Sequence, residues 1–162
     1  MKIISIITGF AIWLIFLTPA MAMDLQSFSG VKTTLQQQLN VGKWSVVVFW
    51  SHDCAICRQE TPALNAFHRK HHKKDAQVLG ISIDGAKNKA KAAQFIQQTA
   101  MAFPTFIGEL VFLAADFYQL SGEAFRGTPT FLLFNPKGEL MGMQAGPLRM
   151  EALEEFMANN RS

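Results

Sequence analysis

The sequence predicts an α/β fold in which one mixed β-sheet carries helices on both faces. Strand-like apolar runs alternate with helix-like segments over most of the chain, and an antiparallel hairpin and a last amphipathic helix follow. No internal repeat and no Pro-, Gly- or Ser-rich linker divides the chain. At 162 residues, 49% hydrophobic and 17% charged, the chain suits one domain and is too apolar to be disordered.

The first residues have the pattern of an export signal rather than of a folded element. Lys2 precedes an uncharged stretch over 3–17, and Pro19 interrupts that stretch before a small-x-small motif that ends at Ala22. This order is typical of a signal peptide and its cleavage site. We therefore expect a signal peptide over 1–22.

An uncleaved membrane anchor is the alternative for this segment. Residues 3–23 carry no charge and are just long enough to span a bilayer. In both cases the domain over 23–162 is expected outside the cytoplasm, in the periplasm or another extracytoplasmic location, or anchored to the inner membrane.

Hydrophobic patterning predicts the elements in order. Continuous β-branched and aromatic runs indicate strands buried on both faces, over 45–50 and 77–83. The turn Asn135-Pro136-Lys137-Gly138 separates two further strands, over 129–134 and 139–145. Amphipathic or Ala- and Lys-rich segments indicate helices. These are expected over 31–40, 54–72 with a kink at Pro62, 86–100, 109–120 and 148–158.

Cys54 and Cys57 are the only cysteines, which excludes a disulfide-stapled scaffold and a four-cysteine zinc module. Cys54 follows a predicted buried strand and should begin a helix, where backbone N–H groups and the helix dipole lower a thiol pKa. Cys57 lies one turn further on, within reach to close a small disulfide. A zinc site with His52 as a third ligand is the alternative, but no fourth ligand follows from the spacing.

The chain resembles a thioredoxin fold in two groups of residues that follow each other in the expected order. The resemblance covers about residues 40–158 and rests on Phe49-Trp50, Cys54-x-x-Cys57-x-x-Glu60-x-Pro62, Gly127-Thr128-Pro129-Thr130, Gly138 and Gly146. The spacing around the cysteines is most similar to that of exported TlpA/ResA/CcmG (DsbE)-like thiol-disulfide oxidoreductases. The helix expected over 86–100 resembles the helix inserted in TlpA-like proteins.

The resemblance implies roles for individual residues. Cys54 matches the attacking thiol and Cys57 the buried resolving thiol, while Glu60 matches an acidic residue that assists proton handling. Pro129 matches the cis-proline opposite the disulfide, and Thr128 would offer backbone groups to an extended substrate. Trp50 completes the candidate substrate-binding set, although core packing suits it better than a catalytic role.

The resemblance also implies partners. No cofactor beyond a redox-active Cys54–Cys57 disulfide and no resident metal are expected. The clients would be exported cysteine-containing proteins, as in cytochrome c maturation, and a membrane protein of DsbD/CcdA type would supply electrons. The net charge of +3 is mild and partly lies in one basic run over 68–74, so no nucleic-acid partner is expected. That run suits a solvated helix end; contact with an anionic lipid or partner is its alternative.

Several departures from the family pattern leave the direction of electron flow open. Asp53, where many relatives have Trp, opposes the helix dipole when ionised, and Val48 replaces the buried acid of thioredoxin itself. A disulfide oxidase or isomerase with the same site, and a copper chaperone using the cysteine pair, are the alternatives. Peroxiredoxins carry Pro and Thr where this chain has Val47 and Ser51, so peroxidase activity is not expected.

Overall fold

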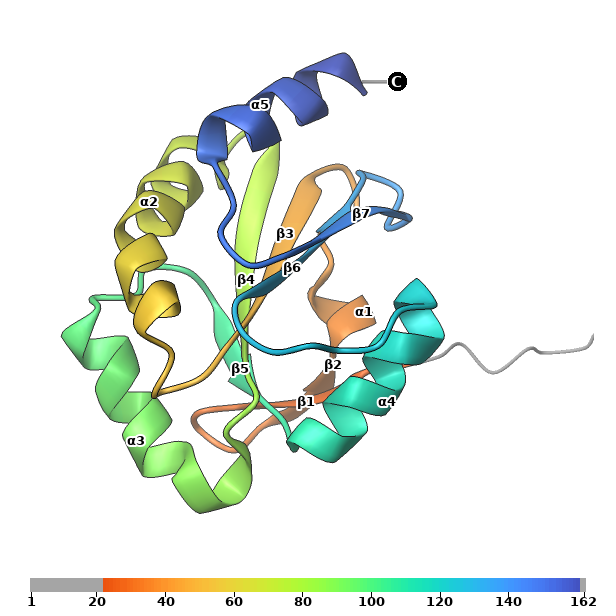
Figure 1. Ribbon diagram of the computed structural model, residues 1–162. Helices are drawn as coiled ribbons and strands as arrows, with labels where there is room; N and C mark the ends of the chain where they lie inside the picture. The colour runs from red at the N-terminus through yellow and green to blue at the C-terminus, as the bar shows by residue number, and fades with distance from the viewer. Residues whose placement is uncertain (1–21, 161–162) are drawn as a thin grey trace, which may run out of the picture.

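The computed structural model describes residues 22–160, and the predicted signal peptide over 1–22 lies outside these except for Ala22. Seven strands form one sheet in the order β2-β1-β5-β4-β3-β6-β7, with β3, β4 and β5 parallel and the other pairs antiparallel (Figure 1). The strands are β1 Asp24–Ser27, β2 Lys32–Thr34, β3 Trp44–Trp50, β4 Ala76–Ser82, β5 Thr105–Ile107, β6 Thr130–Phe134 and β7 Leu140–Ala145. The helices are α1 Leu35–Gln38, α2 Ala55–His71, α3 Gly85–Gln98, α4 Leu110–Ser121 and α5 Met150–Asn159.

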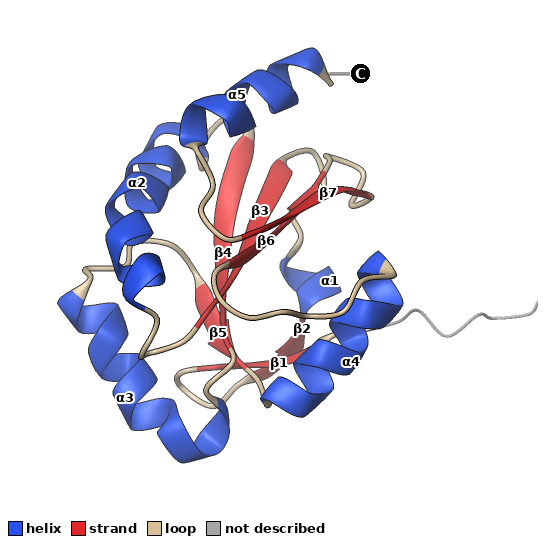
Figure 2. Cartoon of the chain, viewed as in Figure 1, coloured by secondary structure: helices blue, strands red, loops and turns tan. Residues whose placement is uncertain are grey.

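Helices cover both faces of the sheet, as the sequence predicts (Figure 2). Successive residues of β3 point to opposite faces, so Val47 and Phe49 pack in one apolar cluster with Phe117 of α4. Val46 and Val48 pack in the other cluster, which includes residues of α2 and α5. All seven residues of β3 are buried, which explains why its sequence is apolar at every position but Ser45 rather than alternating.

The expected helix over 31–40 is wrong at its start. Lys32–Thr34 form strand β2, which pairs with β1, and only Leu35–Gln38 are helical. Thr34 ends the strand and caps the helix, because its hydroxyl accepts a hydrogen bond from the Gln37 N–H at 3.2 Å. The short strands β1 and β5 are additional to the expected elements. Among residues 22–160, none of the helices combines the length and apolarity needed to cross a membrane.

The basic run over 68–74 is not simply a solvated helix end. His68 and His71 are both buried, and His68 Nδ1 accepts a hydrogen bond from the Val78 N–H at 3.1 Å. The two ring nitrogens of His71 contact Asp75 at 2.8 Å and Glu154 of α5 at 3.2 Å. These histidines therefore pack the end of α2 against β4 and α5.

Candidate active site

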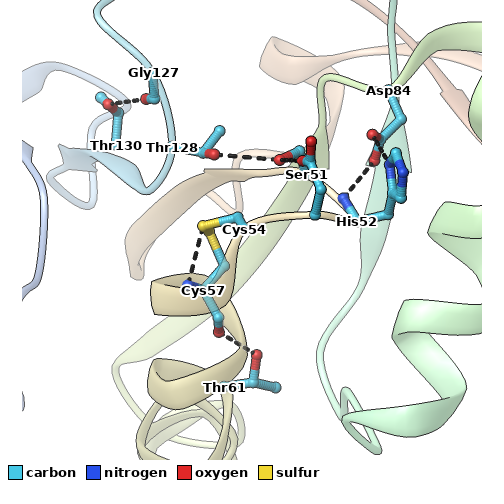
Figure 3. Close-up of a disulfide and its surroundings, with 10 residues drawn as sticks. Ser51, His52, Cys54, Cys57, Thr61, Asp84, Gly127, Thr128 and Thr130 are labelled. Atoms are coloured by element: carbon cyan, nitrogen blue, oxygen red, sulfur yellow. Dashed lines mark hydrogen bonds and ion pairs between the residues drawn. A yellow bond between two sulfur atoms is a disulfide. The ribbon is translucent and has the colours of Figure 1, made fainter.

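The two cysteines lie at the start of α2 and form a disulfide (Figure 3). Cys54 is the N-cap residue, its Sγ accepts a hydrogen bond from the Cys57 N–H at 3.0 Å, and the two Cα atoms are 5.3 Å apart. Cys57 is 5% exposed, whereas Cys54 is only half-buried. Cys54 is therefore the more accessible of the two cysteines.

Strand β3 positions the disulfide because it ends at Trp50, four residues before Cys54. The Cys54 N–H donates to the Ser51 carbonyl at 3.2 Å, which closes a tight turn between strand and helix. The helix then begins at Ala55, and Pro62 lies inside it at the eighth position. The first turn leaves backbone N–H groups facing Cys54, an arrangement that stabilises a thiolate.

Trp50 lies beneath the disulfide rather than on the surface of the site. It is 1% exposed, its indole stacks on Phe95 with centroids 4.9 Å apart, and its Nε1–H donates to Thr105 Oγ1 at 3.1 Å. Trp50 and Phe95 share an apolar cluster with Cys57. The expected contact between Trp50 and a substrate is thus corrected: the side chain supports Cys57 from the core.

The segment Gly127–Thr130 lies opposite the start of α2 (Figure 3). The Thr128–Pro129 peptide bond is cis, and Pro129 is buried. Ser51 Oγ and Thr128 Oγ1 are 3.4 Å apart, so the turn before Cys54 and the segment before Pro129 are in contact. The structure therefore brings Thr128 and Pro129, which the sequence places far from the cysteines, to the same site.

Glu60 is held in a partly buried position one turn after Cys57 on α2. Residues three apart lie on the same helix face, so Glu60 and Cys57 share one. Glu60 Oε1 accepts a hydrogen bond from the Leu148 N–H at 2.8 Å, whereas Oε2 is buried and has no hydrogen-bond partner. Burial raises the pKa of this carboxyl, and the Leu148 hydrogen bond only partly opposes the rise.

The raised pKa of Glu60 predicts a specific pH dependence of stability. The folded chain keeps this proton over a pH window, above the ordinary value of 4.5, in which the unfolded chain has lost it. Stability therefore falls as the pH rises through that window and is unaffected by this group below it. Urea unfolding between about pH 4 and about pH 8 should show wild type losing stability relative to Glu60→Gln as the pH rises.

The control for loss of one charge is Glu155→Gln, which removes an exposed carboxylate of α5. Any fixed cost of burying the Gln amide shifts the Glu60→Gln curve at every pH and does not mimic the trend. A constant difference between Glu60→Gln and wild type across the range would show that Glu60 ionises as freely in the folded chain as in the unfolded one.

A buried aspartate anchors the turn that precedes Cys54. Asp84 follows β4, and its side chain is 4% exposed. It accepts hydrogen bonds from the His52 N–H at 3.0 Å and from Ser82 Oγ at 2.7 Å, and its second oxygen pairs with His52 Nδ1 (Figure 3). Sequence reasoning missed Asp84, although a signal existed: β3 and β4 are parallel neighbours, so polar residues after each strand meet at one sheet edge.

Asp53 lies at the exposed side of the same turn. Ser51 Oγ donates to Asp53 Oδ1 at 2.6 Å, and this hydrogen bond lowers the pKa of the carboxyl. Ligand atoms of His52, Asp53 and Asp84 lie within 4.8 Å of one another, a spacing that a metal ion can use. However, His52 already pairs with Asp84, and Asp53 already accepts a hydrogen bond from Ser51.

Known proteins with similar sequences support the thiol chemistry of this arrangement. The sequence profile of the AhpC/TSA family matches residues 17–143. Sporulation thiol-disulfide oxidoreductase A of Bacillus subtilis is 24% identical over 118 residues, which are 72% of this chain and 68% of that protein. Thiol-disulfide oxidoreductase ResA of Oceanobacillus iheyensis is 25% identical over 129 residues, and the match covers 78% of this chain and 62% of ResA.

Two further matches bear on the fold and on the chemistry. The thioredoxin domain of a Bacteroides vulgatus thiol-disulfide oxidoreductase superposes with a TM-score of 0.69 at 19% identity, covering 84% of this chain and 93% of that chain. This likeness confirms the thioredoxin-like fold. Alkyl hydroperoxide reductase C of Mycobacterium tuberculosis is 40% identical, but over only 53 residues, 32% of this chain and 27% of that protein.

Proposed function

The chain belongs to the AhpC/TSA family, and from that premise we propose that it is a thiol-disulfide oxidoreductase acting on protein disulfides through Cys54 and Cys57. One observation carries the proposal. A disulfide spans the first turn of α2, with Cys54 accessible and Cys57 buried, opposite the Thr128–Pro129 segment. This asymmetry assigns one sulfur to each half of a dithiol exchange.

In the reducing direction, the thiolate of Cys54 attacks a client disulfide. A bond forms between Cys54 Sγ and one client sulfur, the client S–S bond breaks, and the other client sulfur leaves as a thiolate. The thiolate of Cys57 then attacks Cys54 Sγ, which re-forms the Cys54–Cys57 disulfide and releases the second client thiolate. Two electrons pass from the protein dithiol to the client, and the reverse sequence oxidises a client dithiol.

The residues around the cysteines assist these steps. The first-turn N–H groups of α2 stabilise the Cys54 thiolate that attacks and leaves. Glu60, on the helix face of Cys57 and with one unpartnered buried oxygen, is placed to accept the proton that Cys57 loses before its attack. Thr128 lies across the site from the turn before Cys54, where its backbone can pair with an extended client segment.

We assign the reaction to the reducing direction outside the cytoplasm. The export pattern over 1–22 supports the location, and the resemblance to TlpA/ResA/CcmG-like proteins supports the direction. The clients are then exported proteins with cysteine pairs, such as apocytochromes. Because the protein must be re-reduced after each turnover, a membrane electron donor of DsbD/CcdA type is the expected partner.

The reduction potential of the Cys54–Cys57 pair tests this function and its direction. Equilibration in glutathione buffers followed by thiol trapping should give a value near or below about −250 mV, as for proteins that donate electrons. A value near about −120 mV would make the protein an oxidant and overturn the reducing direction. If the two cysteines form no disulfide in any buffer and bind Cu(I) tightly instead, metal transport replaces redox catalysis.

A further inference from the structure

The side chain directly before the first cysteine has no role in the exchange steps above. Asp53 is exposed, yet its carboxylate does not move freely, because Ser51 Oγ holds Oδ1 at 2.6 Å. Within residues 22–160, no other residue donates a hydrogen bond to Oδ2, and Asp53 takes part in no ion pair. An exposed carboxylate, held by a hydrogen bond from Ser51, therefore belongs to the residue directly before the reactive cysteine.

Among residues 22–160, the charge of Asp53 is not neutralised by an ion pair. Lys91 and His52 are close enough to help lower the pKa of this carboxyl, but His52 pairs with Asp84, and Lys91 forms no ion pair with any residue that the structure describes. The start of α2 on its own would attract anions to the site. Asp53 places the opposite charge in the exposed part of the turn directly before Cys54.

Asp53 is also connected to the segment proposed to hold the client. The Ser51 hydroxyl has one proton, and it donates that proton to Asp53 at 2.6 Å. Thr128 Oγ1 is therefore the donor across the 3.4 Å to Ser51 Oγ. This chain of hydroxyls connects the carboxylate with the segment that precedes Pro129.

Covalent capture puts the client within range of this charge. Asp53 and Cys54 are adjacent, so their Cα atoms are about 3.8 Å apart. In the mixed disulfide the client cysteine is bonded to Cys54, which brings its flanking residues close to the residue before Cys54; unscreened charges interact there over roughly one Debye length, about 8 Å at physiological salt. A cation there is attracted and an anion is repelled before and during the exchange.

We propose that Asp53 is a specificity-determining residue that favours clients whose reactive cysteine is flanked by Lys or Arg. The proposal rests on the thiol-disulfide exchange proposed above and adds the chemical class of its substrate. Ser51 is the positioning residue, because it holds the carboxylate in place.

Two matched peptides test the proposal. One carries Lys and the other Glu on both sides of a single cysteine, and each is offered as its symmetric disulfide to the reduced protein. Single-turnover oxidation of the protein is measured by acid quench and alkylation of free thiols. Each rate is then divided by the rate at which the same peptide disulfide is reduced by dithiothreitol, a neutral dithiol, which removes the difference in intrinsic reactivity between the two peptides. The Lys peptide should react about five- to tenfold faster than the Glu peptide at low salt, and the ratio should shrink in about 1 M salt.

Variants then assign the preference to one side chain. Asp53→Asn should bring the ratio close to one, Asp53→Glu should restore part of it, and Glu155→Gln, an exposed carboxylate on α5, should leave it unchanged. An equal rate for the two wild-type reactions, or a preference that survives Asp53→Asn, would overturn the proposal. If neither peptide oxidises the wild-type protein, the exchange function itself is wrong.

Discussion

Replacing Cys54 with serine should lower the rate of insulin-disulfide reduction by about a thousandfold or more. The structure explains the size of the loss, because Cys57 is 5% exposed and offers a client no second point of attack. A serine hydroxyl stays protonated near neutral pH and forms no bond with a client sulfur. The reduction of insulin by dithiothreitol, with and without each protein, measures the effect.

Cys57→Ser is the matched control, because it removes the same disulfide and leaves Cys54 in place. This variant should still attack, yet it cannot release the client, so a covalent adduct should accumulate and be visible on a non-reducing gel. Insulin reduction that survives Cys54→Ser would contradict the assignment of the attacking thiol. An adduct formed by Cys54→Ser and not by Cys57→Ser would reverse the two roles.

Trp50→Ala should cost about 3–5 kcal/mol of unfolding free energy, the largest stability effect expected here. The indole is 1% exposed and stacks on Phe95, and alanine would leave a cavity in the apolar cluster that also contains Cys57. Gly80 on the neighbouring strand leaves the space for the ring, since a Cβ there would lie 3.0 Å from Trp50 Nε1. Urea unfolding of the oxidised protein measures the loss.

Trp50→Phe separates a packing role from contact with a client. It keeps an aromatic ring and loses the hydrogen bond to Thr105, so it should cost only about 1–2 kcal/mol. Its KM for a disulfide peptide should equal that of wild type if the side chain acts only from the core. A several-fold rise in KM with little loss of stability would return Trp50 to the substrate-binding surface.

The sequence predicts most of the sheet because its central strands are unusually apolar. β3 is buried throughout and β4 is buried except at Gln77, and the turn Asn135–Gly138 marks the hairpin of β6 and β7. By contrast, β5 has three residues, too few to show any periodicity, and follows Pro104. Polar Thr residues in β2 read as the start of a helix, and only pairing with β1 makes them a strand.

In the candidate site, features set by neighbouring residues could be predicted from the sequence, whereas contacts between residues far apart in the chain could not. The spacing of Cys54 and Cys57 and their place after a buried strand favour a redox pair over a zinc site, and the second motif around Pro129 makes this prediction specific. Asp84 anchors His52 across 32 residues, a contact that no local pattern contains. The burial of Trp50 was predictable, because it continues the apolar run of β3.

The short separation of the cysteines has a thermodynamic consequence. A disulfide between residues three positions apart closes a very small ring in the unfolded chain, and in the chain-entropy description such a ring contributes only about 2 kcal/mol, against about 3 kcal/mol for 15 residues. Oxidation therefore acts on the unfolded chain by only about 2 kcal/mol. By a thermodynamic cycle, any further difference in folding free energy between the oxidised and reduced forms must come from the native site. The reduction potential of the Cys54–Cys57 pair thus depends mainly on the folded environment of two sulfur atoms at the start of α2, and less on the rest of the chain.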